Sequence, residues 1–161
     1  MAAKVYNRSI LAFGDDDKVT TTYTYIAFPL GTLREEDGKA YRFCKFDASD
    51  VAITANMVVY LETPFTSNLV TADVSDSNAN LVFGVVPGAC ADATWGWVQT
   101  AGIATVTTAG NANIVIGDAL KATGDGTVDR TAANTAPTNR VVGWATASEA
   151  ASKVVAVLTL E

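Results

Sequence analysis

The chain has 161 residues, of which 49% are hydrophobic and only 17% are charged, and its net charge is −6. This length fits one large domain or two small domains that share a core, and the hydrophobic content excludes a disordered chain. Neither half of the sequence is basic, so it lacks the clustered lysines and arginines that bind nucleic acid, and we expect no nucleic-acid partner.

Residues 1–30 differ from the remainder and are predicted to form an extended N-terminal arm, with an all-β body over residues 31–161. An isolated arm has no core of its own, so its large apolar side chains are expected to be buried against a neighbouring subunit or another partner protein. Strand addition to a sheet edge is the expected mode, and a body without residues 1–30 is expected to fold. The candidate interface residues are Tyr6, Ile10, Leu11, Phe13, Tyr23, Tyr25, Ile26 and Phe28.

The body consists of short runs rich in Val, Thr, Ile and aromatic residues, with turn residues between them. This pattern favours pleated strands and a small β-barrel or β-sandwich. A tight hairpin is predicted at Gly124-Asp125-Gly126. The expected strands are Lys39–Phe46, Met57–Leu61, Leu81–Val86, Gly96–Ala101, Ile103–Thr108, Asp118–Ala122, Thr127–Asp129, Val141–Thr146 and Lys153–Leu160.

The pattern predicts few helical residues. We expect helices to make up less than about 15% of the chain, whereas they make up ~30–35% of a typical globular protein. Only Ser49–Asn56 and Ser148–Ser152 could be helical, and both are too short to be major elements. The segment Pro29–Glu36 is ambiguous and could form a turn. The last strand is apolar almost throughout, which predicts a central position in the sheet.

The sequence also contains an internal echo. Val82–Val86 resembles Val141–Ala145, and Asn56–Tyr60 resembles Gly117–Lys121. The two matches lie at nearly the same offset, which indicates a duplicated strand unit of about 60 residues. Because only two copies exist and their identity is weak, chance similarity remains the alternative.

Catalytic chemistry finds little support in the sequence. There is no histidine, which removes the commonest general base and metal ligand. Two cysteines without histidine cannot complete a zinc site, and Cys44 and Cys90 are expected to be reduced, buried and not bonded to each other. The acidic runs fit solvated loops better than a calcium or glycosidase site. We therefore expect no enzyme activity, no metal and no cofactor.

No apolar run approaches the ~20 residues of a membrane helix, and the first residues lack the apolar core of a signal peptide. The expectation is a protein made in the cytoplasm, without a membrane partner. Its low charge, with much apolar side-chain surface, also predicts a homo-oligomer, most simply a trimer.

Three tryptophans carry the remaining signal. Trp95 and Trp97 lie two residues apart, so they share one face of a strand, and Trp144 lies in a later strand. Packing in the core or at a protein interface is the simpler reading. The alternative is an aromatic platform that binds sugar rings, as in a host-attachment module.

From Gly31 onward, a series of short motifs resembles a family of small capsid-accessory proteins of tailed phages, the decoration or cement proteins. The motifs occur in the family's order over about 130 residues, and the Gly-Trp-Val-Gln segment is the most specific. Trp95 stands where the family more often has Tyr, and Asn56 where it usually has Gly. The segments that carry these motifs are Gly38–Arg42, Ala55–Tyr60, Val82–Val86, Trp95–Gln99 with Gly102 and Val106, Gly117–Leu120, Asp125–Val128, Val142–Ala145 and Val157-Leu158.

The resemblance implies a β-barrel or tulip-like body, often trimeric, that sits on the outside of the capsid and binds no cofactor. The implied partner is the major capsid protein, the implied location is the virion surface, and the implied role is to stabilise the shell. A carbohydrate-binding head-fibre or host-attachment module that uses the tryptophans is the alternative function. The N-terminal arm has no counterpart in the resemblance.

Overall fold

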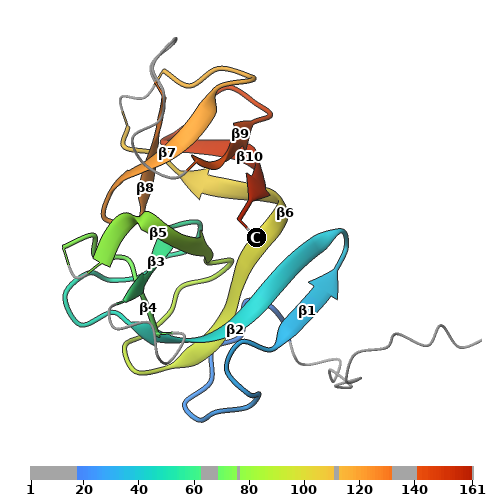
Figure 1. The fold of residues 1–161 in the computed structure, drawn as a ribbon, viewed down its shortest axis with the longest axis vertical. Helices are drawn as coiled ribbons and strands as arrows, with labels where there is room; N and C mark the ends of the chain where they lie inside the picture. The colour runs from blue at the N-terminus through green and yellow to red at the C-terminus, as the bar shows by residue number, and fades with distance from the viewer. Residues whose placement is uncertain (1–17, 63–68, 76, 111–112, 132–140, 161) are drawn as a thin grey trace, which may run out of the picture.

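A computed structural model describes residues 18–62, 69–75, 77–110, 113–131 and 141–160. The described residues form ten strands and no helix (Figure 1), which confirms the all-β prediction. None of the described segments is a helix that could cross a lipid bilayer. The strands are β1 (Leu33–Glu36), β2 (Lys39–Asp47), β3 (Val58–Glu62), β4 (Leu69–Thr71), β5 (Ser77–Val85), β6 (Trp95–Thr107), β7 (Ala119–Gly124), β8 (Thr127–Arg130), β9 (Val141–Ala145) and β10 (Lys153–Thr159).

The two segments that could have been helical are irregular. In Ser49–Asn56, Ile53 is buried and accepts a backbone hydrogen bond from Cys90 at 3.0 Å, so the segment is tied to a distant loop. In the second segment, Ala151 and Ser152 have positive φ angles of 50° and 58°, which a right-handed helix does not allow. Strands β1 and β4 were missed because both are very short.

Strand β6 is one long strand, whereas the sequence predicted two strands separated at Gly102. Gly102 has a φ of +88°, and a Cβ atom there would lie 2.6 Å from the carbonyl oxygen of Gly38. Glycine therefore allows the strand to turn at this point without ending. Residues before the turn pair with β2, and residues after it pair with β10.

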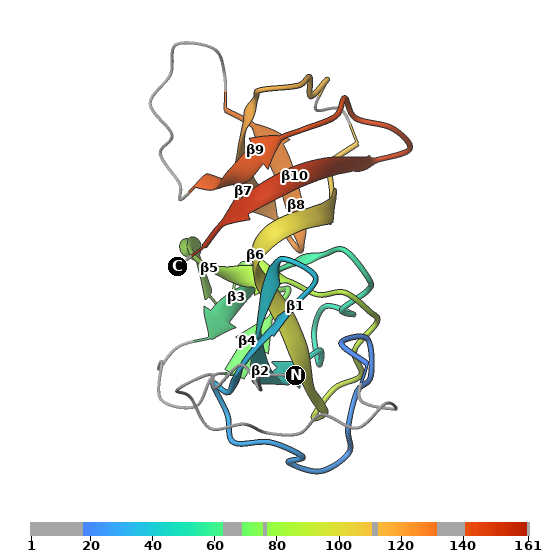
Figure 2. The same ribbon diagram turned by 90° about the vertical axis from the view of Figure 1, so that its right-hand side faces the viewer.

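The sheet order β1-β2-β4-β3-β5-β6-β10-β9-β7-β8, with an additional β2–β6 pairing, closes into two rings that share β6. The first ring, here called unit 1, contains β2 to β5 and the first half of β6. The second ring, unit 2, contains the second half of β6 and β7 to β10, and a parallel bridge between Thr108 and Val128 joins its ends. Figure 2 shows the two rings one above the other, with β6 running through both.

The two units repeat the same topology. The strand order β4-β3-β5-β6 in unit 1 corresponds to β8-β7-β9-β10 in unit 2. The first strand of each unit pairs antiparallel with its last strand, and it meets the strand after the first hairpin in parallel, at β2–β4 in unit 1 and at the Thr108–Val128 bridge in unit 2.

Backbone hydrogen bonds repeat in the same way. Asn56 donates to Val86 at 2.8 Å and Val86 donates to Met57 at 3.0 Å, while in unit 2 Gly117 donates to Ala145 and Ala145 donates to Asp118, both at 2.9 Å. Such agreement in topology and hydrogen bonding, at an offset of about 60 residues, supports the duplicated strand unit.

Each unit has its own interior, and the units also pack against each other. Alternate residues of β3 point into unit 1 (Val59) or toward unit 2 (Val58 and Tyr60). The Tyr60 hydroxyl donates to the carbonyl oxygen of Gly124 at 2.7 Å, and the Val58 amide donates to that of Gly126 at 2.9 Å. The β7–β8 hairpin, which the sequence predicted, is thus docked on unit 1, and the two units form one body.

The last strand is central as predicted, since β10 lies between β6 and β9. Its alternate residues Val154, Ala156 and Leu158 are buried in the interior of unit 2. On the opposite side Val157 is exposed. The centre of the strand is therefore apolar on both faces, although the described chain leaves Val157 on the outer face exposed.

Candidate functional site

An aromatic cluster covers the outer face of β2 and β6 in unit 1. Phe43 from β2 and Trp97 from β6 are cross-strand neighbours with ring centroids 5.2 Å apart. Phe28 packs on both of them at 5.3 Å. The guanidinium carbon of Arg34 lies 5.7 Å from the Trp97 ring centroid, a cation–π contact that closes the cluster on the β1 side.

Residues 18–30 belong to this body. Tyr23 exchanges two backbone hydrogen bonds with Trp95, at 2.8 and 2.9 Å, and its ring meets Phe43 edge to face at 5.9 Å. Tyr23 and Phe28 therefore find their partners within the same chain, which differs from the expectation that another molecule would bury them. The reason is that β2 and β6 carry large aromatic side chains on their outer face, and Tyr23 and Phe28 pack against these side chains.

The next residues along the same segment stay outside the cluster. Tyr25 is 64% exposed and Ile26 is 60% exposed, and Tyr25 touches the body through an edge contact with Tyr23 at 6.1 Å. We call Tyr25 and Ile26 the N-terminal surface. The other candidate arm residues, Tyr6, Ile10, Leu11 and Phe13, lie outside the described residues.

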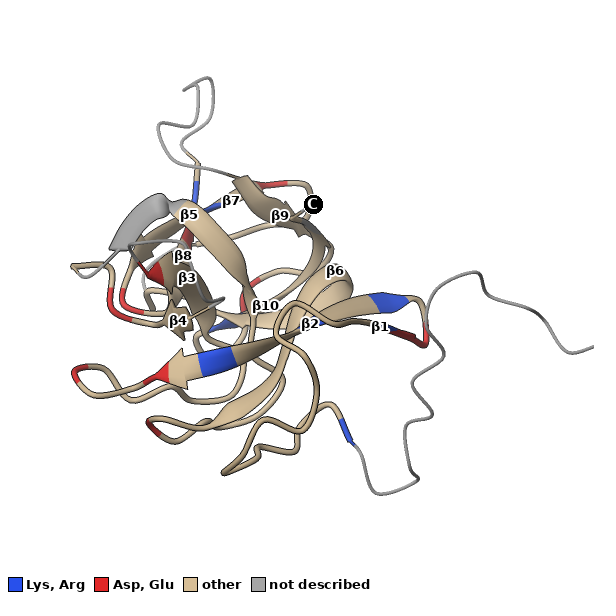
Figure 3. Ribbon diagram, turned by 60° about the horizontal axis from the view of Figure 1, so that its bottom comes forward, with Lys and Arg blue, Asp and Glu red and all other residues tan. Residues whose placement is uncertain are grey.

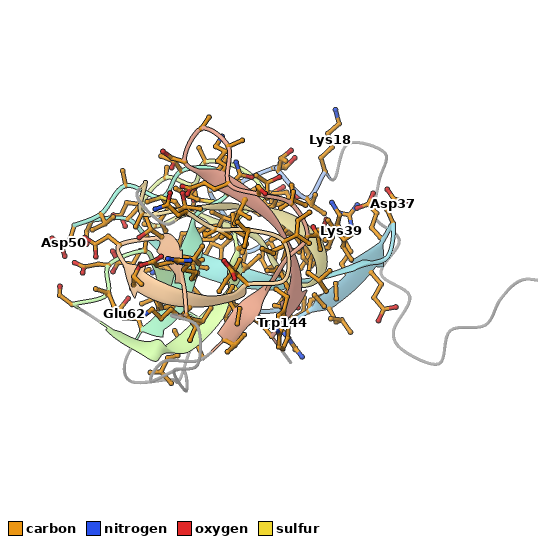
Figure 4. The ribbon with its side chains drawn as sticks, turned by 90° about the horizontal axis from the view of Figure 1, so that it is seen from above. Lys18, Asp37, Lys39, Asp50, Glu62 and Trp144 are labelled. Atoms are coloured by element: carbon orange, nitrogen blue, oxygen red, sulfur yellow. The ribbon has the colours of Figure 1, made fainter. Side chains whose placement is uncertain are left out.

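A second exposed apolar surface crosses unit 2. Ile103 on β6 is opposite Val157 on β10, which is opposite Trp144 on β9, which is opposite Ala119 on β7. Directly opposite residues share a face of the sheet. Ile103, Trp144 and Val157 are 56%, 47% and 37% exposed. We call these four residues the outer row, and Figure 4 shows Trp144 at the edge of the molecule.

The loop before β7 extends this apolar surface. Val115 and Ile116 are both exposed, and the adjacent Gly117 donates a backbone hydrogen bond to Ala145, the neighbour of Trp144, at 2.9 Å. Exposed apolar residues that lie singly on a surface need no explanation, whereas a contiguous group marks an interaction site.

The three tryptophans do not form one platform. Trp97 is buried in the aromatic cluster, so its ring is not accessible to a ligand. Trp95 lies on the same face of β6, as predicted, and is half-buried with the Lys45 ammonium 5.9 Å from its ring centroid. Trp144 belongs to the outer row in the other unit. Only Trp144 therefore offers a ring of substantial exposure.

The titratable groups do not gather in the described part of the chain. No group of three or more Cys, Asp or Glu residues lies close enough there to hold a metal ion. Figure 3 shows the described acidic and basic residues scattered over loops and strand ends. Cys44 and Cys90 are free and buried in unit 1. Burial raises the pKa of Cys90 to about 12 and the pKa of Cys44 further, so both thiols are protonated at neutral pH.

Sequence reasoning missed Ile103 and Val157 as parts of a surface. Both stand about 60 residues after their counterparts in unit 1, Tyr41 and Gln99, which form the same kind of cross-strand pair. Extending the internal echo from the motifs around Gly84 and Gly143 to the neighbouring strands would have found them.

Comparisons with known proteins find a likeness in fold but none in sequence. No protein-family model matches the sequence, and no curated protein is significantly similar to it. Among solved structures, the fold is similar to the N base of head fibre protein gp8.5 of bacteriophage phi29, with a TM-score of 0.54 and 15% identity. The match covers 75% of this chain and 94% of the phage chain. At this identity the likeness shows a shared fold.

Proposed function

We propose that this protein is a non-catalytic structural component of a tailed-phage virion. In this proposal it decorates the outer surface of the capsid as a cement protein, binds the major capsid protein and stabilises the shell. It assembles as a homotrimer and needs no cofactor. It is made in the host cytoplasm and joins the particle there.

The observation that carries the proposal is the agreement of two comparisons that use different information. Short sequence motifs resemble capsid-accessory proteins of tailed phages, and the fold is shared with almost the whole base of a phage head fibre. Fold alone does not fix a function. The agreement between motifs and fold supports a role on the phage head.

Exposed apolar residues supply the contacts that such a role requires. The N-terminal surface, Tyr25 and Ile26, is held firmly because the neighbouring Tyr23 pairs with Trp95 on β6. Rigid aromatic anchors carry much of the energy of protein interfaces. We therefore assign capsid binding to this surface together with the preceding residues of the arm.

A capsid-stability assay tests the proposal. Phage capsids that lack the protein would be incubated with wild-type protein or with the double variant Tyr25→Ser/Ile26→Ser, and the temperature at which they release DNA would be measured. We expect wild-type protein to bind and raise that temperature, and the variant to bind at least tenfold more weakly. Capsids that neither bind the wild-type protein nor gain stability from it would contradict the proposal.

The exposure of Trp144 favours a second candidate, a carbohydrate-binding head-fibre or host-attachment module. Sugar rings stack on exposed aromatic faces, and Trp144 is the tryptophan that could offer one. A glycan-array screen separates the candidates, because a cement protein is expected to give no signal. A glycan signal that disappears in Trp144→Ala would favour the attachment module instead.

A further inference from the structure

The duplication supplies a comparison within the molecule, because each surface of unit 2 has a counterpart in unit 1. The outer row of unit 2 consists of Ile103, Val157, Trp144 and Ala119. Counted by strand and register in the repeated topology, its counterparts in unit 1 are Tyr41, Gln99, Val85 and Val58. They form the same kind of row, since Tyr41 is opposite Gln99, Gln99 is opposite Val85, and Val85 is opposite Val58.

All four counterparts in unit 1 are buried. Tyr41 belongs to the aromatic cluster that Tyr23 and Phe28 of the N-terminal segment complete. The side-chain amide of Gln99 donates hydrogen bonds to the carbonyl oxygens of Ala101 and Ile103, at 3.1 and 3.0 Å. Val85 and Val58 are covered by unit 2, whose β7–β8 hairpin hydrogen-bonds to β3. In unit 1, this face is therefore a contact surface, and half of it is a contact between two copies of the same fold.

In unit 2, the described chain leaves the corresponding face open. Between about a third and just over half of the surface of Ile103, Trp144 and Val157 is exposed, although none of these residues is charged. The charged Lys121 takes the position that Tyr60 holds on β3, at the margin of the row. An uncharged row with a polar margin is the usual make-up of a protein interface.

We propose that the outer row is the surface through which copies of this chain associate, and that its occupant is a second copy. Within one chain, unit 2 covers part of this face of unit 1, and the described residues place no further unit over the outer row. A second copy can supply the missing unit. This inference rests on the proposed self-association of the chain, and it does not depend on capsid binding.

The geometry also indicates the kind of assembly. If unit 1 of the second copy occupies the outer row, as unit 2 occupies the face of unit 1, the contact joins two different surfaces. Such head-to-tail contacts close into rings or continue as filaments. A ring of three chains has six units, each covered by the next, which is the arrangement that the proposed homotrimer requires.

The test measures the mass of the full-length protein in solution by light scattering over a range of concentrations. We expect wild-type protein to have a multiple of 16.8 kDa and Trp144→Glu to have a mass of 16.8 kDa at concentrations where the wild type is assembled. Tyr25→Ser, which changes an exposed aromatic residue outside the row, is the control and should keep the wild-type mass. A monomeric wild type, or a Trp144→Glu variant with unchanged mass, would overturn the inference.

A second measurement covers the case in which Trp144→Glu does not fold. Because both native thiols are buried, a cysteine introduced at Val157 is the reactive thiol of its variant. We expect maleimide to label Val157→Cys at least tenfold more slowly than Ile26→Cys in the assembled protein. Equal labelling rates would show that no second copy covers the outer row and would overturn the inference. The labelling rates do not depend on capsid binding, so a failure of the capsid assay would contradict the proposed function and not this inference.

Discussion

Two glycines show how single residues control this fold. Gly102 and Gly117 both have positive φ angles, +88° and +91°, but only Gly102 lies against backbone, with a Cβ position 2.6 Å from the Gly38 carbonyl oxygen. Nothing lies within 4 Å of a Cβ atom at Gly117. The left-handed region costs a residue with a side chain roughly 1–2 kcal/mol, and a close contact adds roughly 1–3 kcal/mol.

We therefore predict that Gly102→Ala destabilises the protein by more than Gly117→Ala. The free energy of unfolding from urea titrations would fall by about 1–2 kcal/mol for Gly117→Ala and by about 2–5 kcal/mol for Gly102→Ala. Equal losses would mean that the approach of β6 to the β1–β2 turn does not constrain the strand.

The aromatic cluster makes a second residue-scale prediction. Trp97 is buried between Phe28, Phe43 and Arg34, so Trp97→Ala should lower the free energy of unfolding by about 3–5 kcal/mol. Tyr25→Ala removes an aromatic ring that is mostly exposed, and we expect a loss of about 0.5 kcal/mol or less. Urea titration of both variants measures the difference, and a mild effect of Trp97→Ala would show that the cluster is not packed as described.

The buried thiols predict low reactivity. Burial raises the pKa of Cys90 from 9.0 to about 12 and also raises that of Cys44, so almost no thiolate exists in the folded protein at pH 8. A chromogenic disulfide reagent at pH 8 should modify no thiol in the folded protein and two thiols per chain in urea. Ile26→Cys is the positive control, with one thiol modified before unfolding.

The same pKa shifts have a consequence for stability. The folded chain keeps thiol protons that the unfolded chain releases above pH 9, so the unfolded state gains relative stability there. The contribution of the thiols to stability is complete below pH 9 and is lost as the pH rises from 9 toward 12. Removing the thiols in the Cys44→Ala/Cys90→Ala variant should flatten this part of the pH profile.

At the scale of elements, the N-terminal segment yields a prediction that differs from the one made from sequence. Removing residues 1–17 leaves Tyr23 and Phe28 in the aromatic cluster, whereas removing residues 1–30 exposes Phe43 and Trp97. Each buried aromatic side chain contributes roughly 1.5–3 kcal/mol, so the longer truncation should lose about 3–6 kcal/mol more. Urea midpoints that are equal for the two truncations would contradict the assignment of residues 18–30 to the body.

Most strands could be predicted from the sequence because turn residues punctuate clear runs of β-forming residues. The β7–β8 hairpin and the central position of β10 are examples. Two kinds of feature could not be predicted. Short strands such as β4, with three residues, carry too little pattern, and the passage of β6 through Gly102 depends on a close contact with Gly38 that only the folded chain reveals.

The sequence does not distinguish the environments of the candidate interface residues. The sequence singled out Trp97 and Trp144 equally, although one is buried and the other is exposed. Their difference comes from what covers each strand, because residues 18–30 lie over β6 in unit 1 and no described segment lies over β9 in unit 2. Such long-range covering is not encoded in the alternation of a single strand.

At the scale of the whole molecule, the described residues form a tandem pair of small closed rings. Each ring fills its interior with aliphatic and aromatic side chains, and strand β6 connects the two rings covalently and by hydrogen bonds. Ring closure also leaves few free strand edges, which protects a β-rich protein from unwanted pairing. The exposed apolar residues of the described chain are the surfaces that the proposed assembly uses.

The most direct test of the central claim, a structural role on the outside of a phage capsid, is electron cryomicroscopy of phage particles assembled in the presence of this chain. We predict that the reconstruction shows density for the two-ring body of this protein on the outer capsid surface, at positions repeated with the symmetry of the shell. In the assembly proposed here, the N-terminal surface faces the capsid protein and each outer row faces a neighbouring copy. Virions that lack this density, or that carry the protein only inside the head or along the tail, would contradict the account.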